Sequence, residues 1–96
     1  MNMYMKGYGK MTNVVKIKLN TINEIKDFIN IVNRYDEDVD IYRDNPQRYK
    51  DAKSFMSIIS LDTSIGAYVR IMSSDRQIVQ DFNNDMKQFK MEEVNE

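Results

Sequence analysis

The chain has 96 residues, which is enough for one domain with a single hydrophobic core and too few for two ordinary domains. Apolar residues make up 42% and charged residues 30%, a globular composition, and the absence of histidine and cysteine excludes imidazole catalysis, thiol chemistry and disulfides. A formal net charge of −1 argues against a dedicated nucleic-acid binder, which clusters Lys and Arg against phosphates.

The first elements are an N-terminal extension and a strand. Residues 1–13 combine Met, Tyr, Lys and Gly without helical or strand periodicity, and this predicts a flexible extension. In residues 14–19, Val15, Ile17 and Leu19 alternate with lysines. A period of two is typical of a half-buried strand, so we predict the first strand here.

An amphipathic helix is predicted to follow. Thr21 and Glu24 stand at the spacing of a capping box, which marks a helix start. Apolar residues then recur at spacings of three and four: Ile22, Ile25, Phe28, Ile29 and Val32. The helix should end near residues 33–35.

A hairpin is predicted next. Residues 39–43 contain Val39 and Ile41 and are β-like, and residues 44–47 hold the only proline of the chain. We therefore expect a turn that connects strand 39–43 to a second strand over residues 47–50.

The last third of the chain predicts a helix, a strand and a helix. Residues 52–61 are densely apolar, as in a short helix packed on a core, and Gly66 interrupts the pattern before a strand over residues 68–72. Ser74 or Asp75 would cap the final helix. That helix should bury Ile78, Val79, Phe82, Met86 and Phe89, and residues 92–96 would form a tail.

The predicted order is β-α-β-β-α-β-α over residues 14–91. It is typical of a small α+β domain in which helices cover one face of an antiparallel sheet. The order by itself leaves several topologies open.

The stretch Asp51-Ala52-Lys53-Ser54-Phe55-Met56-Ser57-Ile58-Ile59-Ser60-Leu61, followed by Gly66-Ala67-Tyr68-Val69-Arg70-Ile71, resembles the histidine-containing phosphocarrier (HPr) family. That family typically reads Asn-x-Lys-Ser-Ile-Met-Gly-x-x-Ser-Leu and then Gly-x-x-(Ile/Val)-x-Ile. The segment Arg34-Tyr35-Asp36-Glu37-Asp38-Val39 is also similar to the family's link between first helix and second strand. The resemblance covers residues 14–89.

This resemblance implies an HPr-like open-faced sandwich, with a four-stranded antiparallel sheet covered on one face by three helices. It also implies a role in or around the bacterial sugar phosphotransferase system. The partners would be enzymes of that system, a serine kinase or a transcriptional regulator. It leaves the oligomeric state open.

The chain departs from the family where phosphate would be carried. Active relatives have a Gly-x-His-x-Arg-Pro-like loop before the first helix, whereas this chain has Asn20, Thr21, Asn23 and Glu24 in the same region. A carboxylate at a helix start opposes an incoming phosphate. The resemblance therefore implies a degenerate phosphohistidine loop without phosphotransfer activity.

The resemblance further implies a regulatory phosphorylation site and a docking surface. Ser54 matches a serine that a dedicated kinase modifies in many low-GC Gram-positive relatives, and the docking candidates are Lys53, Phe55, Met56 and Ile59. Two simpler interpretations stay open. Ser54 is also suited to be an ordinary helix cap, and the apolar residues are also suited to a core.

Two further patterns are weaker. Asp36, Asp38 and Asp40 are similar to the first half of a calcium loop, but the required glycine and glutamate are missing, so no metal site is predicted. Aromatic and basic residues share the hairpin, namely Tyr42, Arg43, Arg48, Tyr49 and Lys50. Stacking on a nucleic-acid strand is one interpretation, and an ordinary exposed hairpin is the favoured one.

The sequence therefore predicts a regulatory protein-binding module of the phosphotransferase system that is not an enzyme and needs no cofactor. The alternative is a divergent structural or interaction module unrelated to sugar transport. No apolar run reaches the roughly 20 residues of a membrane span, and absent cysteine fits a reducing compartment, so we expect a cytoplasmic location without membrane binding.

Overall fold

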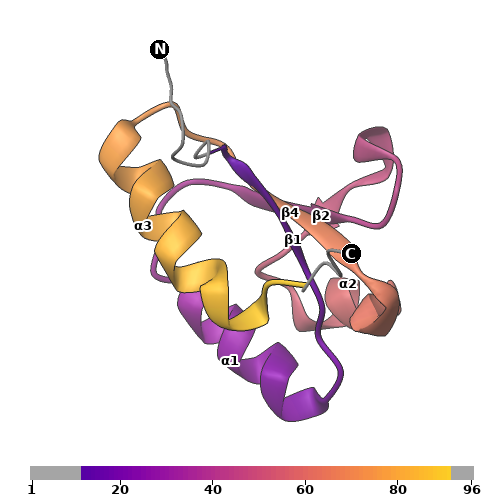
Figure 1. Ribbon diagram of the computed structural model, residues 1–96. Helices are drawn as coiled ribbons and strands as arrows, with labels where there is room; N and C mark the ends of the chain where they lie inside the picture. Colours follow the sequence, from indigo (N-terminus) through magenta and orange to yellow (C-terminus); the bar gives the residue numbers. More distant parts are fainter. Residues whose placement is uncertain (1–11, 92–96) are drawn as a thin grey trace, which may run out of the picture.

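The computed structural model describes residues 12–91 (Figure 1). In chain order its elements are β1 (Val14–Ile17), α1 (Ile22–Val32), β2 (Val39–Tyr42), β3 (Lys50–Asp51), α2 (Phe55–Ile59), β4 (Ala67–Ile71) and α3 (Arg76–Met86). Three short 3-10 segments connect or extend them: η1 (Pro46–Arg48), η2 (Thr63–Ile65) and η3 (Lys87–Phe89).

The four strands form one sheet in the order β1-β4-β2-β3, and every neighbouring pair is antiparallel. Strand β4 is therefore central although it is last in the chain. Val69 of β4 pairs with Val15 on one side and with Ile41 on the other. The predicted α+β class, with a four-stranded antiparallel sheet and three helices, is confirmed.

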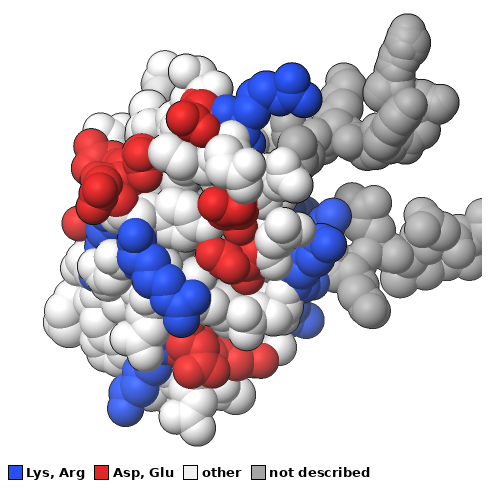
Figure 2. Space-filling view, turned by 90° about the vertical axis from the view of Figure 1, so that its left-hand side faces the viewer, with Lys and Arg blue, Asp and Glu red and all other residues white. Residues whose placement is uncertain are grey.

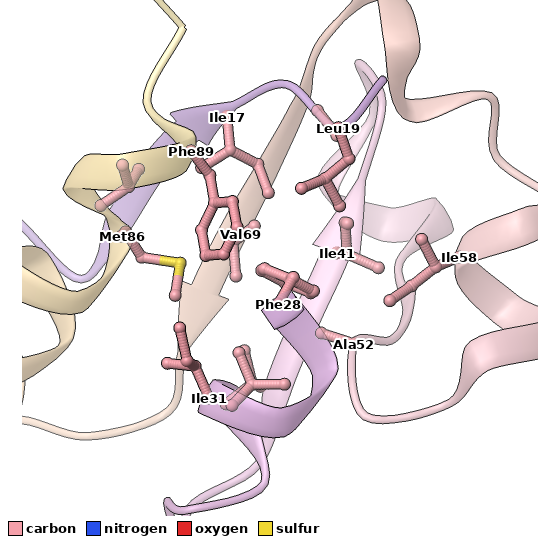
Figure 3. Close-up of a cluster of buried hydrophobic side chains, with 14 of the residues drawn as sticks. Ile17, Leu19, Phe28, Ile31, Ile41, Ala52, Ile58, Val69, Met86 and Phe89 are labelled. Carbon is pink, nitrogen blue, oxygen red and sulfur yellow. The ribbon is translucent and has the colours of Figure 1, made fainter. Parts of the chain in front are cut away.

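The hydrophobic core lies between one face of the sheet and the helices. Alternate strand residues point to this face because the side-chain period of a strand is two. The buried strand residues are Val15, Ile17, Val39, Ile41, Ala67, Val69 and Ile71. Figure 3 shows Phe28 of α1, Ile58 of α2 and Met86 of α3 pointing into the same cluster, so all three helices contribute to the core.

The outer edge of β1 is covered by the segment after α3. Ile17 forms an isolated bridge with Lys90, and the Lys18 amide donates to the Phe89 carbonyl over 2.9 Å. The Phe89 ring packs edge-on against Phe28, with 5.6 Å between the centroids. This cover satisfies backbone groups that would otherwise be open to pairing with another chain.

The strands differ from prediction in two places. β1 ends at Ile17, and although Leu19 is buried, its amide bonds to Thr63 outside the ladder. The predicted strand over residues 47–50 is wrong. Pro46 and the Asn45 cap start the turn η1 instead, and only Lys50 and Asp51 pair with β2, although the hairpin itself is confirmed.

The helices also differ in detail. The predicted helix over residues 52–61 begins only at Phe55 because Ser54 caps it, and it ends at Ile59. Asp75, rather than Ser74, caps α3. Ile22 was predicted on the buried stripe of α1 but is 50% exposed, because the first turn of the helix projects past the sheet. Ile78 and Val79 are only half-buried.

The described residues include the whole predicted domain, 14–91, and two residues of the predicted N-terminal extension. Thr12 and Asn13, the last residues of the predicted extension, are hydrogen-bonded to the domain: the Ile71 amide donates to the Asn13 carbonyl, and Asn83 Nδ2 donates to the Thr12 carbonyl. Residues 1–11 and the predicted tail, 92–96, lie outside the described residues.

Candidate functional site

The turn into α1 is closed by its own side chains. The Thr21 hydroxyl accepts from the Glu24 amide over 3.1 Å, and a Glu24 carboxylate oxygen accepts in return from the amides of Asn20 and Thr21. The predicted capping box is thus present. Its two reciprocal arms satisfy backbone donors that a helix leaves free at its start.

These bonds determine which backbone amides of residues 20–24, the predicted degenerate phosphohistidine loop, could bind a ligand. Free amides at a helix start are the groups that hold a phosphate, and here the Glu24 carboxylate takes the amide of the cap residue Thr21 and that of Asn20 just before it. Asn20 and Asn23 are exposed. An anion that used the Thr21 amide would compete with the Glu24 carboxylate for it.

The start of α2 is organised differently. Ser54 is half-buried, and its hydroxyl oxygen accepts from the Ser57 amide over 3.3 Å. Ser54 therefore caps α2, as one of the two interpretations of the sequence predicted. Capping leaves the hydroxyl proton free, so it does not conflict with a second role for the oxygen.

Lys53, predicted as a docking residue, is engaged inside the domain. Its ammonium group donates to the Tyr35 carbonyl over 2.6 Å, and its amide donates to the Asp51 carboxylate over 2.9 Å. These bonds fasten the residue before α2 to the loop after α1. Its ammonium group is therefore hydrogen-bonded within the domain, and its predicted role in docking stays a prediction.

Three apolar residues predicted for docking lie on the surface of α2. Met56 is 73% exposed, Ile59 42% and Phe55 38%, whereas their neighbour Ile58 is fully buried. A helix of five residues buries one face only, so the others remain outside. We call Phe55, Met56 and Ile59 the α2 patch.

The chain entering α1 is joined to the segment that follows α2. The Leu19 amide donates to the Thr63 carbonyl, and the Thr63 hydroxyl donates to the Leu19 carbonyl over 3.2 Å. This pair joins the chain entering α1 to η2, which follows α2 (Figure 1). Gly66 ends η2 with a φ of 109°, a conformation that favours glycine.

Tyr35 connects three parts of the fold. Its hydroxyl donates to the Asp85 carboxylate over 2.6 Å, its ring packs edge-on against Phe82, and its carbonyl holds Lys53. Burial, reinforced by the bond to Asp85, raises the pKa of Tyr35 well above its usual range. The hydroxyl is therefore a poor acid and serves as a structural donor.

The helix-free face of the sheet carries a stack that the sequence analysis missed. The rings of Tyr42 and Tyr68 stack with centroids 5.4 Å apart, the Lys16 ammonium lies 5.4 Å from the Tyr68 ring, and the Arg70 guanidinium lies 5.4 Å from the Tyr42 ring. Arg70 also pairs with Asp40 over 3.0 Å. Alternation along the strands was the available signal, because it places these residues opposite the core.

The contacts of Arg70 bear on two further sequence patterns, the acidic residues before β2 and the aromatic and basic residues of the hairpin. Asp40 is held by Arg70, so the three acidic residues do not act together, and among residues 12–91 no group of His, Cys, Asp or Glu is arranged to hold a metal ion. Tyr42 is only 8% exposed and lies on the sheet face, where the Arg70 guanidinium lies over both its ring and that of Tyr49. The basic hairpin residues Arg43, Arg48 and Lys50 are exposed.

Charges on the face that carries α3 are mixed. Figure 2 shows acidic and basic side chains interspersed there, without a broad region of one sign. Among the helices of the described residues, none combines the length and the apolar character needed to cross a membrane.

Comparison with known proteins gave no match. No protein-family model matches the chain, and neither the curated proteins nor the solved structures include a significant relative. The resemblance to the HPr family therefore stays a prediction based on the motif around Ser54.

Proposed function

We propose that the protein is a regulatory protein-binding module of the HPr type that acts in the cytoplasm with the sugar phosphotransferase system and is switched by phosphorylation at Ser54. The observation that carries the proposal is the juxtaposition of Ser54 with the α2 patch. A modifiable hydroxyl immediately precedes three exposed apolar side chains on the same short helix. Such a patch is a surface for a protein partner.

The switch follows from charge. A phosphate ester on Ser54 would add nearly two negative charges beside the α2 patch and displace the hydroxyl from its contact with the Ser57 amide. A partner with an apolar pocket flanked by Arg or Lys would then bind the modified form more tightly, because charge-assisted hydrogen bonds are added to the apolar contact. A partner with an acidic rim would be released.

The proposed role does not include phosphotransfer. The chain has no histidine, and the Glu24 carboxylate takes the amides of Asn20 and Thr21 before the first turn of α1. Phosphothreonine at Thr21 would be a poor donor because an ester lacks the transfer potential of a phosphoramidate. The module is therefore proposed to bind partners without catalysing a reaction.

Phosphorylation is tested by incubation with a serine kinase of HPr proteins and ATP, with intact mass as the readout. We expect one added phosphate on the wild type and none on Ser54→Ala. Ser60→Ala is the matched control, since Ser60 is an exposed serine at the other end of α2, and it should be labelled like the wild type. An unlabelled wild type, or equal labelling of Ser54→Ala, contradicts the proposal.

Docking is tested by binding to the sugar-responsive repressor that recognises phosphorylated HPr proteins. Met56→Glu places a charge in the α2 patch and should weaken binding at least tenfold, because it buries a carboxylate without a partner. Met72→Glu is the control, since Met72 is 51% exposed but follows β4. Equal losses in the two variants would place the contact elsewhere.

The second candidate is an interaction module that has left sugar transport. It is favoured by the Glu24 carboxylate, which makes the former phosphate loop self-contained. Affinity capture from native lysate separates the candidates. Recovery of phosphotransferase enzymes or the repressor supports the first, and a stable partner of another kind supports the second.

A further inference from the structure

A hollow of about 520 Å³ lies beside the connection between β2 and β3, and its lining is rich in cations. Arg43, Arg48 and Lys50 contribute basic groups, and Asp44 contributes one carboxylate. Three positive charges against one negative leave a local formal charge of +2 on a chain whose net charge is −1. The volume is in the range of small-ligand sites, roughly 300–1,000 Å³.

These cations have no acidic partner within the described residues. The one ion pair between residues 12 and 91 joins Arg70 and Asp40, and it lies outside this hollow. Like charges gathered in a concave site repel one another and raise the local concentration of anions. The hollow therefore favours an anion that relieves the repulsion.

Two lining residues give the hollow a defined shape. The Arg43 guanidinium donates through Nη1 to the Leu61 carbonyl over 3.2 Å, which fixes the side chain across the hollow. Tyr49 is 54% exposed, and one side of its ring is approached by Arg70 at 5.7 Å from the centroid. A planar, fork-shaped donor near an exposed ring is suited to a phosphate attached to a ring or another flat group.

The stacking surface is too small for a nucleic-acid strand. Tyr42 is 8% exposed, and its ring lies between Tyr68 and Arg70. Only Tyr49 remains to stack at this hollow, whereas proteins that bind single strands offer successive rings to successive bases. The arrangement matches a small molecule better than a polymer.

We propose that this hollow is a binding site for a small phosphorylated molecule. Arg43, Arg48 and Lys50 hold the phosphate, and Tyr49 and Leu61 contact the organic part of the ligand. The site is independent of the proposed docking function, because it shares no residue with Ser54 or the α2 patch.

The test is an NMR titration of the full chain with pyrophosphate and with adenosine diphosphate. We expect saturable shifts of the amides of Arg43, Arg48, Lys50 and Leu61 with both probes. The double change Arg43→Gln and Arg48→Gln should weaken binding by at least about tenfold, because it removes charge-assisted hydrogen bonds. Tyr49→Ala should weaken adenosine diphosphate more than pyrophosphate.

Matched charge changes separate a site from a general attraction. Asp44→Asn should tighten binding by about threefold because it removes the opposing charge. Lys26→Gln and Asp27→Asn remove one positive and one negative charge on the exposed face of α1 and should leave binding unchanged.

Three results would overturn the proposal. They are the absence of saturable shifts at the hollow, a loss in Lys26→Gln as large as in the arginine variants, and tenfold tighter binding of a single-stranded oligonucleotide than of adenosine diphosphate. The last result would assign the surface to nucleic acid. Each variant's amide spectrum reports whether it is folded before ligand is added.

Discussion

The starts of α1 and α2 have similar caps but different supports. Thr21 and Ser54 each accept an amide of the first helical turn, yet only α1 has a second arm, in which the Glu24 carboxylate takes two amides. The start of α2 is instead held from outside, by the bond from Lys53 to the Tyr35 carbonyl. The start of α1 is closed by local sequence, whereas that of α2 combines a local bond, from the Lys53 amide to the Asp51 carboxylate, with a tertiary one.

This difference explains why the two starts have different chemical prospects. A carboxylate in the first turn of α1 disfavours a phosphate at Thr21, whereas the first turn of α2 has no acidic residue and its nearest acidic contact is the Asp51 carboxylate on the Lys53 amide. The bond from Lys53 to the Tyr35 carbonyl holds α2 in place without involving the Ser54 hydroxyl. Functional sites are often built in this way, on a short element that a rigid scaffold positions.

The largest expected effect comes from the side chain of Tyr35, the residue whose carbonyl holds Lys53. Tyr35→Phe removes the hydroxyl that bonds to Asp85 and should lower the free energy of unfolding by about 2 kcal/mol, because Asp85 loses a charge-assisted hydrogen bond. Urea denaturation measures the loss. Tyr49→Phe, at an exposed ring, is the control and should stay within about 0.5 kcal/mol of the wild type.

The same residue predicts a pH dependence. Its folded pKa is raised, so its contribution is complete below the unfolded value of about 10 and is lost as the pH rises through the folded pKa. The advantage of wild type over Tyr35→Phe should shrink as the pH rises from 9 to 11, and solvent screening at this partly exposed hydroxyl limits the size of the change. The other tyrosines are the same in both proteins, so the comparison isolates Tyr35. A constant difference between the two proteins from pH 8 to 11 would contradict this assignment.

Loss of the capping box of α1 should lower the free energy of unfolding by less than loss of the Tyr35 hydroxyl. Glu24→Ala opens the second arm of the capping box and should cost about 1 kcal/mol in the free energy of unfolding. Asn23→Ala, in the same turn but outside the box, should change little. Hydrogen exchange should rise in the first turn of α1 and stay unchanged in α2. A rise in both helices would mean that the two starts are coupled.

Lys53→Met should produce the converse pattern. It keeps the apolar stem and removes the bond to the Tyr35 carbonyl, so α2 should exchange its amides several times faster while α1 is unaffected. Lys26→Met, on the exposed face of α1, is the control. Unchanged exchange in α2 would show that the bond does not support this helix.

The smallest effect is expected at the α2 cap itself. Ser54→Ala should cost about 0.5 kcal/mol, at the low end for a cap, because the helix has only five residues and a 3.3 Å capping bond. Thermal unfolding at two protein concentrations is the measurement. A loss above 1.5 kcal/mol would mean that Ser54 mainly stabilises the helix. The labelling of Ser54→Ala would then have to be corrected for the fraction of the variant that is folded.

The fold was largely predictable where periodicity is strong. The alternation in β1, the stripe of α1 and the branched residues of β4 each specify one buried face, because side chains repeat every two residues in a strand and about every 3.6 in a helix. Prediction failed around Pro46 and Ala52, where runs of two to five residues are too short to show a period.

The candidate site was predictable only in part. The capping box at Thr21 and Glu24 is a local pattern, and its sequence spacing was sufficient. The role of Lys53 depends on the Tyr35 carbonyl 18 residues away, and the stack of Tyr42 and Tyr68 depends on strand pairing. Neither contact has a signature within one segment of sequence.

The sequence by itself determined that histidine chemistry is absent, that Glu24 closes the turn into α1, and that the chain forms an α+β domain, because each depends on composition or on neighbours within a few residues. Only the tertiary structure decided which apolar residues of α2 stay outside, how Tyr35 holds Lys53, and that three cations share one hollow. Those features arise where distant segments meet, and the packing of the core sets which side chains face one another there.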